Sequence, residues 1–104
     1  MAENFTFIAH FEAKPGSEQR LQQALLECVP PSLAEEGCLA YRPYADLAEP
    51  RKAILVERWK DSASLEYHFT TQHFKKLQQV FDEVLVHPFD ADMLVDSDET
   101  PPAP

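Results

Sequence analysis

His68 and His73 are the residues of this sequence whose type and spacing first suggest chemistry. They lie in the segment LEYHFTTQHFKKL, residues 65–77, among several aromatic residues. An imidazole titrates near pH 6.5, so either ring can accept a proton at neutral pH or bind a metal ion. The segment is therefore a candidate metal site, a candidate catalytic pocket, or a helix face that carries histidine without using it.

The spacing of the two histidines argues against a metal site. Residues five positions apart on a continuous helix point about 140° away from each other. The HExxH zinc motif uses a spacing of four, and no further cysteine, histidine or carboxylate stands at a recognisable interval. We therefore predict no bound metal. However, the threonines of residues 70–72 are mediocre helix formers, and a bend there would turn both rings toward one cavity. The alternative is that the two rings do not share a cavity. In that case we expect His68 to lie half-exposed beside Tyr67, and His73 to cap or pack at the start of the helical segment that follows the threonines.

A second group of chemically interesting residues lies on two predicted strands. Glu57 and Trp59 have the same parity on one strand, and Tyr41 lies on the neighbouring strand. If this face meets the helices, it can form an aromatic pocket for a flat small molecule. If it faces the other way, Trp59 belongs to a subunit interface, and the pattern alone leaves both orientations open. The candidate substrate-binding residues are Trp59, Tyr41, Glu57, Phe74 and Phe81.

The elements that position these residues follow the order β-α-β-β-α-β. Alternating apolar residues indicate strands, and apolar residues at helical spacing indicate helices. We expect Ser17 to cap the first helix, and Pro30 and Pro31 to kink or restart it. The predicted strands are residues 4–13, 38–44, 52–59 and 89–95. The predicted helices are residues 17–36 and about 61–86. This order is typical of the α+β, ferredoxin-like split βαβ fold, with a four-stranded antiparallel sheet and both helices on one face.

Such a sheet leaves one face uncovered by helices. The predicted strands at residues 4–13 and 52–59 both carry apolar residues on their two sides. An apolar face of this kind is normally buried, and a second copy of the chain is the simplest cover. We therefore predict a homodimer.

Length and charge exclude several classes of function. The 104 residues suffice for one domain, which we assign to residues 1–95, followed by a disordered acidic and proline-rich tail at residues 96–104. A net charge of −9 argues against nucleic acid as a partner. The sequence shows no membrane-length apolar run and no signal pattern, so we expect a soluble, cytoplasmic protein without a membrane partner. Neither a catalytic elbow motif nor a phosphate-binding glycine loop is present, which argues against bound nucleotide or flavin.

Four segments in order resemble one known family. FIAHFEAKPG (residues 7–16), EEGCLAYRP (residues 35–43), ILVERW (residues 54–59) and LEYHFTTQHFKKL are together similar to the antibiotic biosynthesis monooxygenases, and within them to small quinol monooxygenase-like proteins. The resemblance implies a dimeric α/β barrel with a pocket between each sheet and its own helices. It also implies oxidation of a quinol or polycyclic phenol by O₂ without metal, flavin or haem. In this reading His68 or His73 accepts the phenolic proton, while Tyr41 and Glu57 orient the substrate.

Other branches of the resembling family offer alternatives. Haem-degrading members use a strand asparagine and a helix histidine, but this sequence has Ala9 and, near the second position, Gln78. Relatives that isomerise a phosphorylated signalling sugar share an H-x-T-T-x-H segment like that of residues 68–73, so an isomerase is the runner-up. A third reading is a dimer that binds a small aromatic molecule and catalyses nothing.

Overall fold

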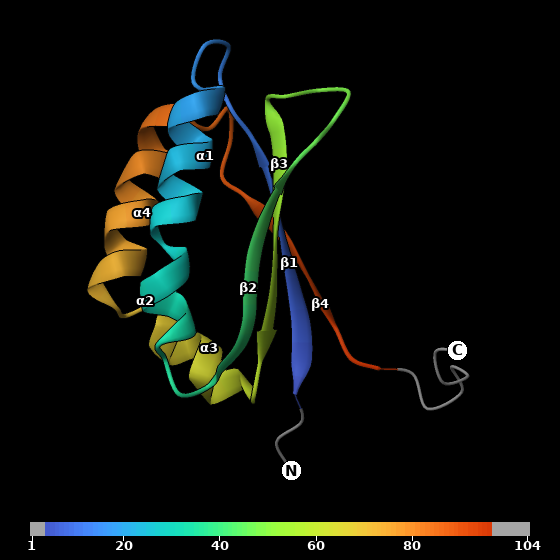
Figure 1. The fold of residues 1–104 in the computed structure, drawn as a ribbon, viewed down its shortest axis with the longest axis vertical. Coiled ribbons are helices and arrows are strands. Elements are labelled where there is room, and N and C mark those ends of the chain that lie inside the picture. The colour runs from blue at the N-terminus through green and yellow to red at the C-terminus, as the bar shows by residue number, and fades with distance from the viewer. Residues whose placement is uncertain (1–3, 97–104) are drawn as a thin grey trace.

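A computed structural model describes residues 4–96 and shows one antiparallel sheet with all its helices on the same face (Figure 1). The strand order is β2-β3-β1-β4. The strands are β1 (Phe5–Glu12), β2 (Cys38–Ala45), β3 (Lys52–Trp59) and β4 (Asp90–Leu94). The helices are α1 (Glu18–Glu27), α2 (Val29–Leu33), α3 (Ser62–His68) and α4 (Gln72–Val84). The predicted ferredoxin-like fold is confirmed.

Local chemistry explains where each helix begins and ends. Pro30 and Pro31 occupy the first turn of α2, where a missing N–H costs nothing, so the chain restarts a helix after α1 as expected. Asp61 caps α3 by accepting a hydrogen bond from the Ser64 amide at 2.8 Å. The expectation that Ser17 caps α1 with its side chain is wrong, because Ser17 stands at the cap position without such a bond.

Strand register decides which side chains face the helices. In β1, Phe5, Phe7, Ala9 and Phe11 are buried, while the residues between them are more exposed. Phe5 pairs with Trp59 and Phe7 with Glu57, and paired residues in an antiparallel sheet point to the same side. Trp59 and Glu57 therefore lie under the helices, and the orientation that the sequence left open is resolved in favour of the helix face.

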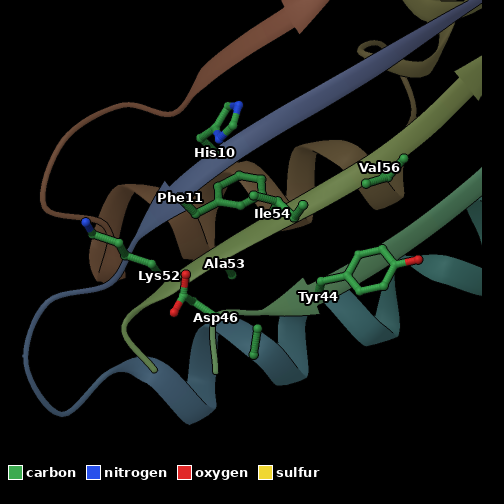
Figure 2. A pocket seen from close by; sticks show the side chains of 9 residues that line it. His10, Phe11, Tyr44, Asp46, Lys52, Ala53, Ile54 and Val56 are labelled. Atoms are coloured by element: carbon green, nitrogen blue, oxygen red, sulfur yellow. The ribbon is translucent and has the colours of Figure 1, made fainter. Parts of the chain in front are cut away.

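The opposite face of the sheet carries partly exposed apolar side chains. Ile8 of β1 and Ile54 and Val56 of β3 lie on it, beside Tyr44 of β2, whose exposed fraction is 49%. A hollow of about 580 Å³ on this face is lined by Ile54, Val56 and Tyr44 together with His10, and the helices lie behind the strands in this view (Figure 2).

The described residues also show the state of the cysteines and the character of the helices. Cys28 and Cys38 are free, buried thiols. Among residues 4–96, no helix has the length and apolarity needed to cross a lipid bilayer. The predicted tail lies outside the described residues apart from Asp96.

Candidate active site

His68 is the last residue of α3, and its side chain is buried with an exposed fraction of only 1%. Its ring packs against Trp59, Phe74 and Tyr41, with ring centroids 4.8, 5.3 and 5.5 Å away. Burial lowers the pKa of His68, although the hydrogen bond and the charge of Glu35 act in the opposite direction. The imidazole is therefore neutral at pH 7 and able to accept a proton.

A break between α3 and α4 brings the second histidine to the first. Residues 69–71 leave the helix, as the two threonines predicted, and the rings of His68 and His73 lie 5.6 Å apart. Thr71 holds both sides of the break: its hydroxyl donates to the His68 carbonyl at 2.7 Å and accepts from the Phe74 amide at 3.2 Å. The wide separation expected on a continuous helix is wrong here, because the helix is not continuous.

Glu35 joins the two histidines. Its Oε2 atom lies 2.6 Å from Nδ1 of His68 and 2.6 Å from Nε2 of His73, and its side chain is only 6% exposed. No motif in the sequence points to Glu35. It precedes the histidines by 33 and 38 residues and belongs to no helix or strand, so periodicity gave no signal for it. One carboxylate and two imidazoles thus form a single cluster in the structure.

The turn between α2 and β2 positions Glu35. The Glu35 carbonyl accepts from the Cys38 amide at 3.1 Å, which closes the turn. Gly37 then lies so close to Ser64 of α3 that any Cβ at this position would collide with the serine side chain. The Gly37 carbonyl also accepts from the Lys60 amide at 2.8 Å. The missing side chain of Gly37 thus lets the turn approach the first turn of α3.

A second buried pair lies next to the cluster. The indole Nε1 of Trp59 donates to Oε1 of Glu57 at 2.8 Å, and the two residues are 0% and 3% exposed. Burial raises the pKa of Glu57 from its usual 4.5 to about 8, with the bond from Trp59 acting against the rise and the charge of Glu35 adding to it. Glu57 is therefore mostly protonated at neutral pH.

The remaining predicted site residues divide into two groups. Tyr41 and Phe74 pack against His68, so they join Trp59 and the histidines. Burial raises the pKa of the Tyr41 hydroxyl, which donates to Sγ of Cys28 at 3.5 Å. Phe81 lies elsewhere: it packs at 4.9 Å on Phe11 and 5.6 Å on Phe89. Four predicted residues thus gather around His68, and Phe81 belongs to a separate aromatic cluster.

Comparison with known proteins identifies the family. The model of the antibiotic biosynthesis monooxygenase family matches residues 4–80. The chain belongs to this family. One curated relative is the "Probable quinol monooxygenase YgiN" of Escherichia coli (strain K12), which is 37% identical over 67% of this chain and 77% of its own length.

Solved structures have the same fold as this chain. The crystal structure of PA3566 from Pseudomonas aeruginosa is 33% identical, with a TM-score of 0.86 over 93% of this chain and 97% of that chain. The structure of Rv0793 from Mycobacterium tuberculosis is 25% identical, with a TM-score of 0.85 over 95% of this chain and all (100%) of that chain.

The cluster of Glu35, His68 and His73 has ligand types that suit a divalent metal ion. The three ligand atoms lie within 4.8 Å of one another, and the other oxygen of Glu35 is buried without a hydrogen-bond partner. However, the two oxygen–nitrogen distances are 2.6 Å, whereas ligands about 2.0–2.1 Å from one tetrahedral ion stand roughly 3.3 Å apart. The atoms are therefore arranged as hydrogen-bond partners in this family member.

Access to the aromatic residues of the candidate site is closed in the structure. Trp59 and His68 are 0% and 1% exposed, so no space large enough for a water molecule adjoins either side chain. Phe69, in the link between α3 and α4, packs against His68, Phe7 and Phe74 and is itself 37% exposed. Phe69 is the exposed residue that covers His68, so a molecule approaching the histidine from this side must displace its ring.

We expect Glu57→Gln to change how stability depends on pH. Between pH 4.5 and about 8 the unfolded chain releases the Glu57 proton while the folded chain keeps it, so stability falls as pH rises. Glutamine still accepts from Trp59 and carries no proton to lose. The urea midpoint of Glu57→Gln, taken relative to that of the unmodified protein, should therefore rise from pH 4.5 to about 8. Urea titrations at several pH values measure this, with the exposed Glu66→Gln as a control, and parallel curves for all three proteins would contradict it.

Proposed function

We propose that this chain is a cofactor-independent monooxygenase that oxidises a small quinol or polycyclic phenol with O₂. The observation that carries the proposal is the neutral His68 ring, enclosed by aromatic residues and held through Nδ1 by Glu35. The arrangement supports a base because Nε2, which Glu35 does not engage, is left for a substrate hydroxyl. Family membership and the relative named as a probable quinol monooxygenase support the same class of reaction.

The chemistry needs a base and a dry site more than a cofactor. Removal of the phenolic proton gives an anion rich enough in electrons to reduce O₂ directly. One oxygen atom then enters the ring and the other leaves as water. A phenol and O₂ thus give a quinone and water, and a quinol and O₂ give a hydroxyquinone and water. His68 takes the phenolic proton in this scheme. Trp59, Tyr41 and Phe74 supply the flat apolar walls, and the protonated Glu57 offers a neutral polar group beside them.

Substrate entry in this proposal depends on Phe69. Its ring covers His68 and belongs to the short link between α3 and α4, which is held by side-chain hydrogen bonds of Thr70 and Thr71. A flat aromatic substrate would replace Phe69 against His68 and Phe74, exchanging one aromatic contact for another. The proposal thus requires a movement of this link and leaves the sheet unchanged.

The alternatives are less well supported by the contacts. An isomerase acting on a phosphorylated sugar needs cations for the phosphate, as a rule lysine or arginine. Among the described residues, the buried charged or polar ones are Ser32, Glu57 and His68, to which the nearly buried Glu35 adds another carboxyl group. A binding protein without catalysis would fit the same aromatic walls, and the experiment below separates it from an oxygenase.

The deciding experiment measures oxygen uptake by purified, metal-free protein with a panel of hydroquinones and phenols. We expect uptake above the spontaneous rate, with a phenol converted to its quinone and a hydroquinone to its hydroxyquinone. Binding of a quinone without oxygen uptake would favour the binding protein, and rearrangement of a phosphorylated sugar, followed by phosphorus NMR, would favour the isomerase. Elemental analysis and an absorption spectrum accompany the assay. A stoichiometric metal or a haem band needed for activity would overturn independence from cofactors.

We also propose that the chain forms a homodimer through the face of the sheet opposite the helices. Ile8, Ile54 and Val56 give this face an apolar centre, and Tyr44 and Leu94 extend it with exposed fractions of 49% each. Phe7, the neighbour of Ile8 in β1, is only 6% exposed and lies under the helices. Phe7 therefore supports the core, and Ile54 is the better probe of the interface.

We expect Ile54→Asp to dissociate the dimer. An aspartate at the centre of a closed apolar interface would lose its hydration without gaining a partner, which favours the separated subunits. Sedimentation velocity at micromolar concentration measures the shift to monomer. The matched control is Leu47→Asp, the same kind of change at a fully exposed loop position. A stable monomer before any substitution, or a dimer that survives Ile54→Asp, would contradict the proposed interface.

A further inference from the structure

We propose that Glu35, His68 and His73 form a proton relay that carries the substrate's proton from the buried ring of His68 to water at His73. The inference rests on the proposed function and adds to it a path for the proton. It also gives the two histidines different tasks. His68 is the acceptor next to the substrate, and His73 is the residue that releases the proton.

The geometry of the cluster supports a relay. Both imidazoles contact the same oxygen, Oε2 of Glu35, at 2.6 Å. A nitrogen and an oxygen approach this closely only with a proton between them, and the length is that of a strong, charge-assisted bond. The three groups therefore form a continuous hydrogen-bonded chain from Nδ1 of His68 to Nε2 of His73 through one oxygen atom.

The two ends of the cluster differ in their exposure to solvent. The side chain of His68 is 1% exposed, whereas that of His73 is 22% exposed. His73 also lines a cavity of about 200 Å³ between α1, α2 and α4, together with Glu27, Cys28 and Lys76. A water molecule occupies roughly 30 Å³ of liquid, so this cavity has room for several. A base as buried as His68 cannot return a proton to solvent directly, and His73 offers the exit.

The transfers balance when one proton is shared between Glu35 and His73 before the reaction. His68 takes the phenolic proton on Nε2 and gives the proton on Nδ1 to Oε2 of Glu35. Oε2 gives its own proton to Nε2 of His73, which releases another from Nδ1 to water. One proton enters and one leaves, and no electrons move in the relay. The electrons pass from the phenolate to O₂. The oxygen atom that leaves takes the ring hydrogen and one proton from water, so the complete reaction releases no net proton.

The test removes the exit and replaces it from outside. In His73→Ala, we expect kcat for oxygen uptake to fall roughly 100-fold, the lower end for a positioned proton-transfer group, while KM stays unchanged. Imidazole added to the buffer should enter the enlarged cavity and restore kcat in a saturable manner. Pyrazole has the same ring size but is a far weaker base, so it should not restore activity. His87→Ala, at an exposed position outside the cluster, is the matched control and should respond to neither compound.

A second variant separates the relay from a purely structural role. Glu35→Gln keeps a hydrogen-bonding side chain of the same size but interrupts the chain before the cavity. We expect a similar loss of kcat that imidazole does not restore. Full activity of His73→Ala, equal rescue by pyrazole, or rescue of Glu35→Gln would overturn the relay. Activity lost in His68→Asn but kept in these two variants would leave the proposed oxidation standing without the relay.

A measurement on the unmodified chain tests the relay independently of activity. Nitrogen-15 NMR of labelled histidines reports which ring nitrogen carries the proton. The relay requires His68 to hold its proton on Nδ1, toward Glu35, and we expect this tautomer at neutral pH. It should be lost in Glu35→Ala, which removes the acceptor. A proton on Nε2 of His68 in the unmodified protein would overturn the relay even if no substrate had been found.

Discussion

Replacing His68 by asparagine is expected to lower kcat for oxygen uptake roughly 100-fold to 10,000-fold, the range for removal of a positioned base. The asparagine amide places a nitrogen close to the position of Nδ1, so the bond to Glu35 can persist while the accepting Nε2 is lost. KM should change little, because Trp59, Tyr41 and Phe74 still form the walls. An oxygen electrode measures the initial rates.

The control for this variant is His87→Asn, the same substitution at an exposed position. Circular dichroism and the unfolding midpoint should show that both variants are folded. If His68→Asn kept full oxygen uptake while folded, the proton-acceptor role would be wrong. Loss of uptake in the His87 variant as well would point to an effect of the substitution that has nothing to do with the site.

The second large effect is expected from Trp59→Ala, which should destabilise the fold by roughly 3–5 kcal/mol. The indole is completely buried, so its removal leaves a cavity between β3 and α3 and takes contacts from His68. It also removes the donor that satisfies Glu57, a group that is too buried to recover this bond from water. Urea unfolding measures the free energy of unfolding.

Trp59→Phe separates the two contributions of the tryptophan. Phenylalanine keeps an aromatic ring and loses the Nε1 donor, so we expect a smaller loss of about 1–3 kcal/mol, the usual cost of an unpaired buried polar group. Substrate affinity is therefore better compared in the phenylalanine variant. A loss below 1 kcal/mol in Trp59→Ala would contradict the close packing of this ring in solution.

Strand patterns predicted much of the fold because the alternation of side chains is a local property. The division of β1 into a buried row containing Phe7 and a row containing Ile8 follows from parity alone. Which row faces the helices depends on how the helices pack, and the sequence of a single strand does not contain this information. The face of the sheet on which Trp59 lies follows only from the pairing of β3 with β1.

The candidate site was predictable only in part. His68 and Trp59 were recognisable by residue type. The two threonines at residues 70 and 71 predicted the break between α3 and α4 that brings the two histidines together. Glu35 could not be found in this way, because its place depends on the turn before β2 and on the close approach of Gly37 to α3. Phe81 lies on the same face of α4 as Phe74, but about two turns further along the helix, where it contacts Phe11.

The position of Trp59 makes the molecule its own optical probe. Trp59 is the single tryptophan of the chain. Its ring nitrogen donates a hydrogen bond to Glu57, and its ring packs against His68. All indole fluorescence therefore originates inside the candidate site. Its emission maximum reports whether water reaches the ring, and a quinone stacked nearby would quench it. Opening of the Phe69 cover and entry of a substrate can thus be followed in the unlabelled protein, without any engineered fluorophore.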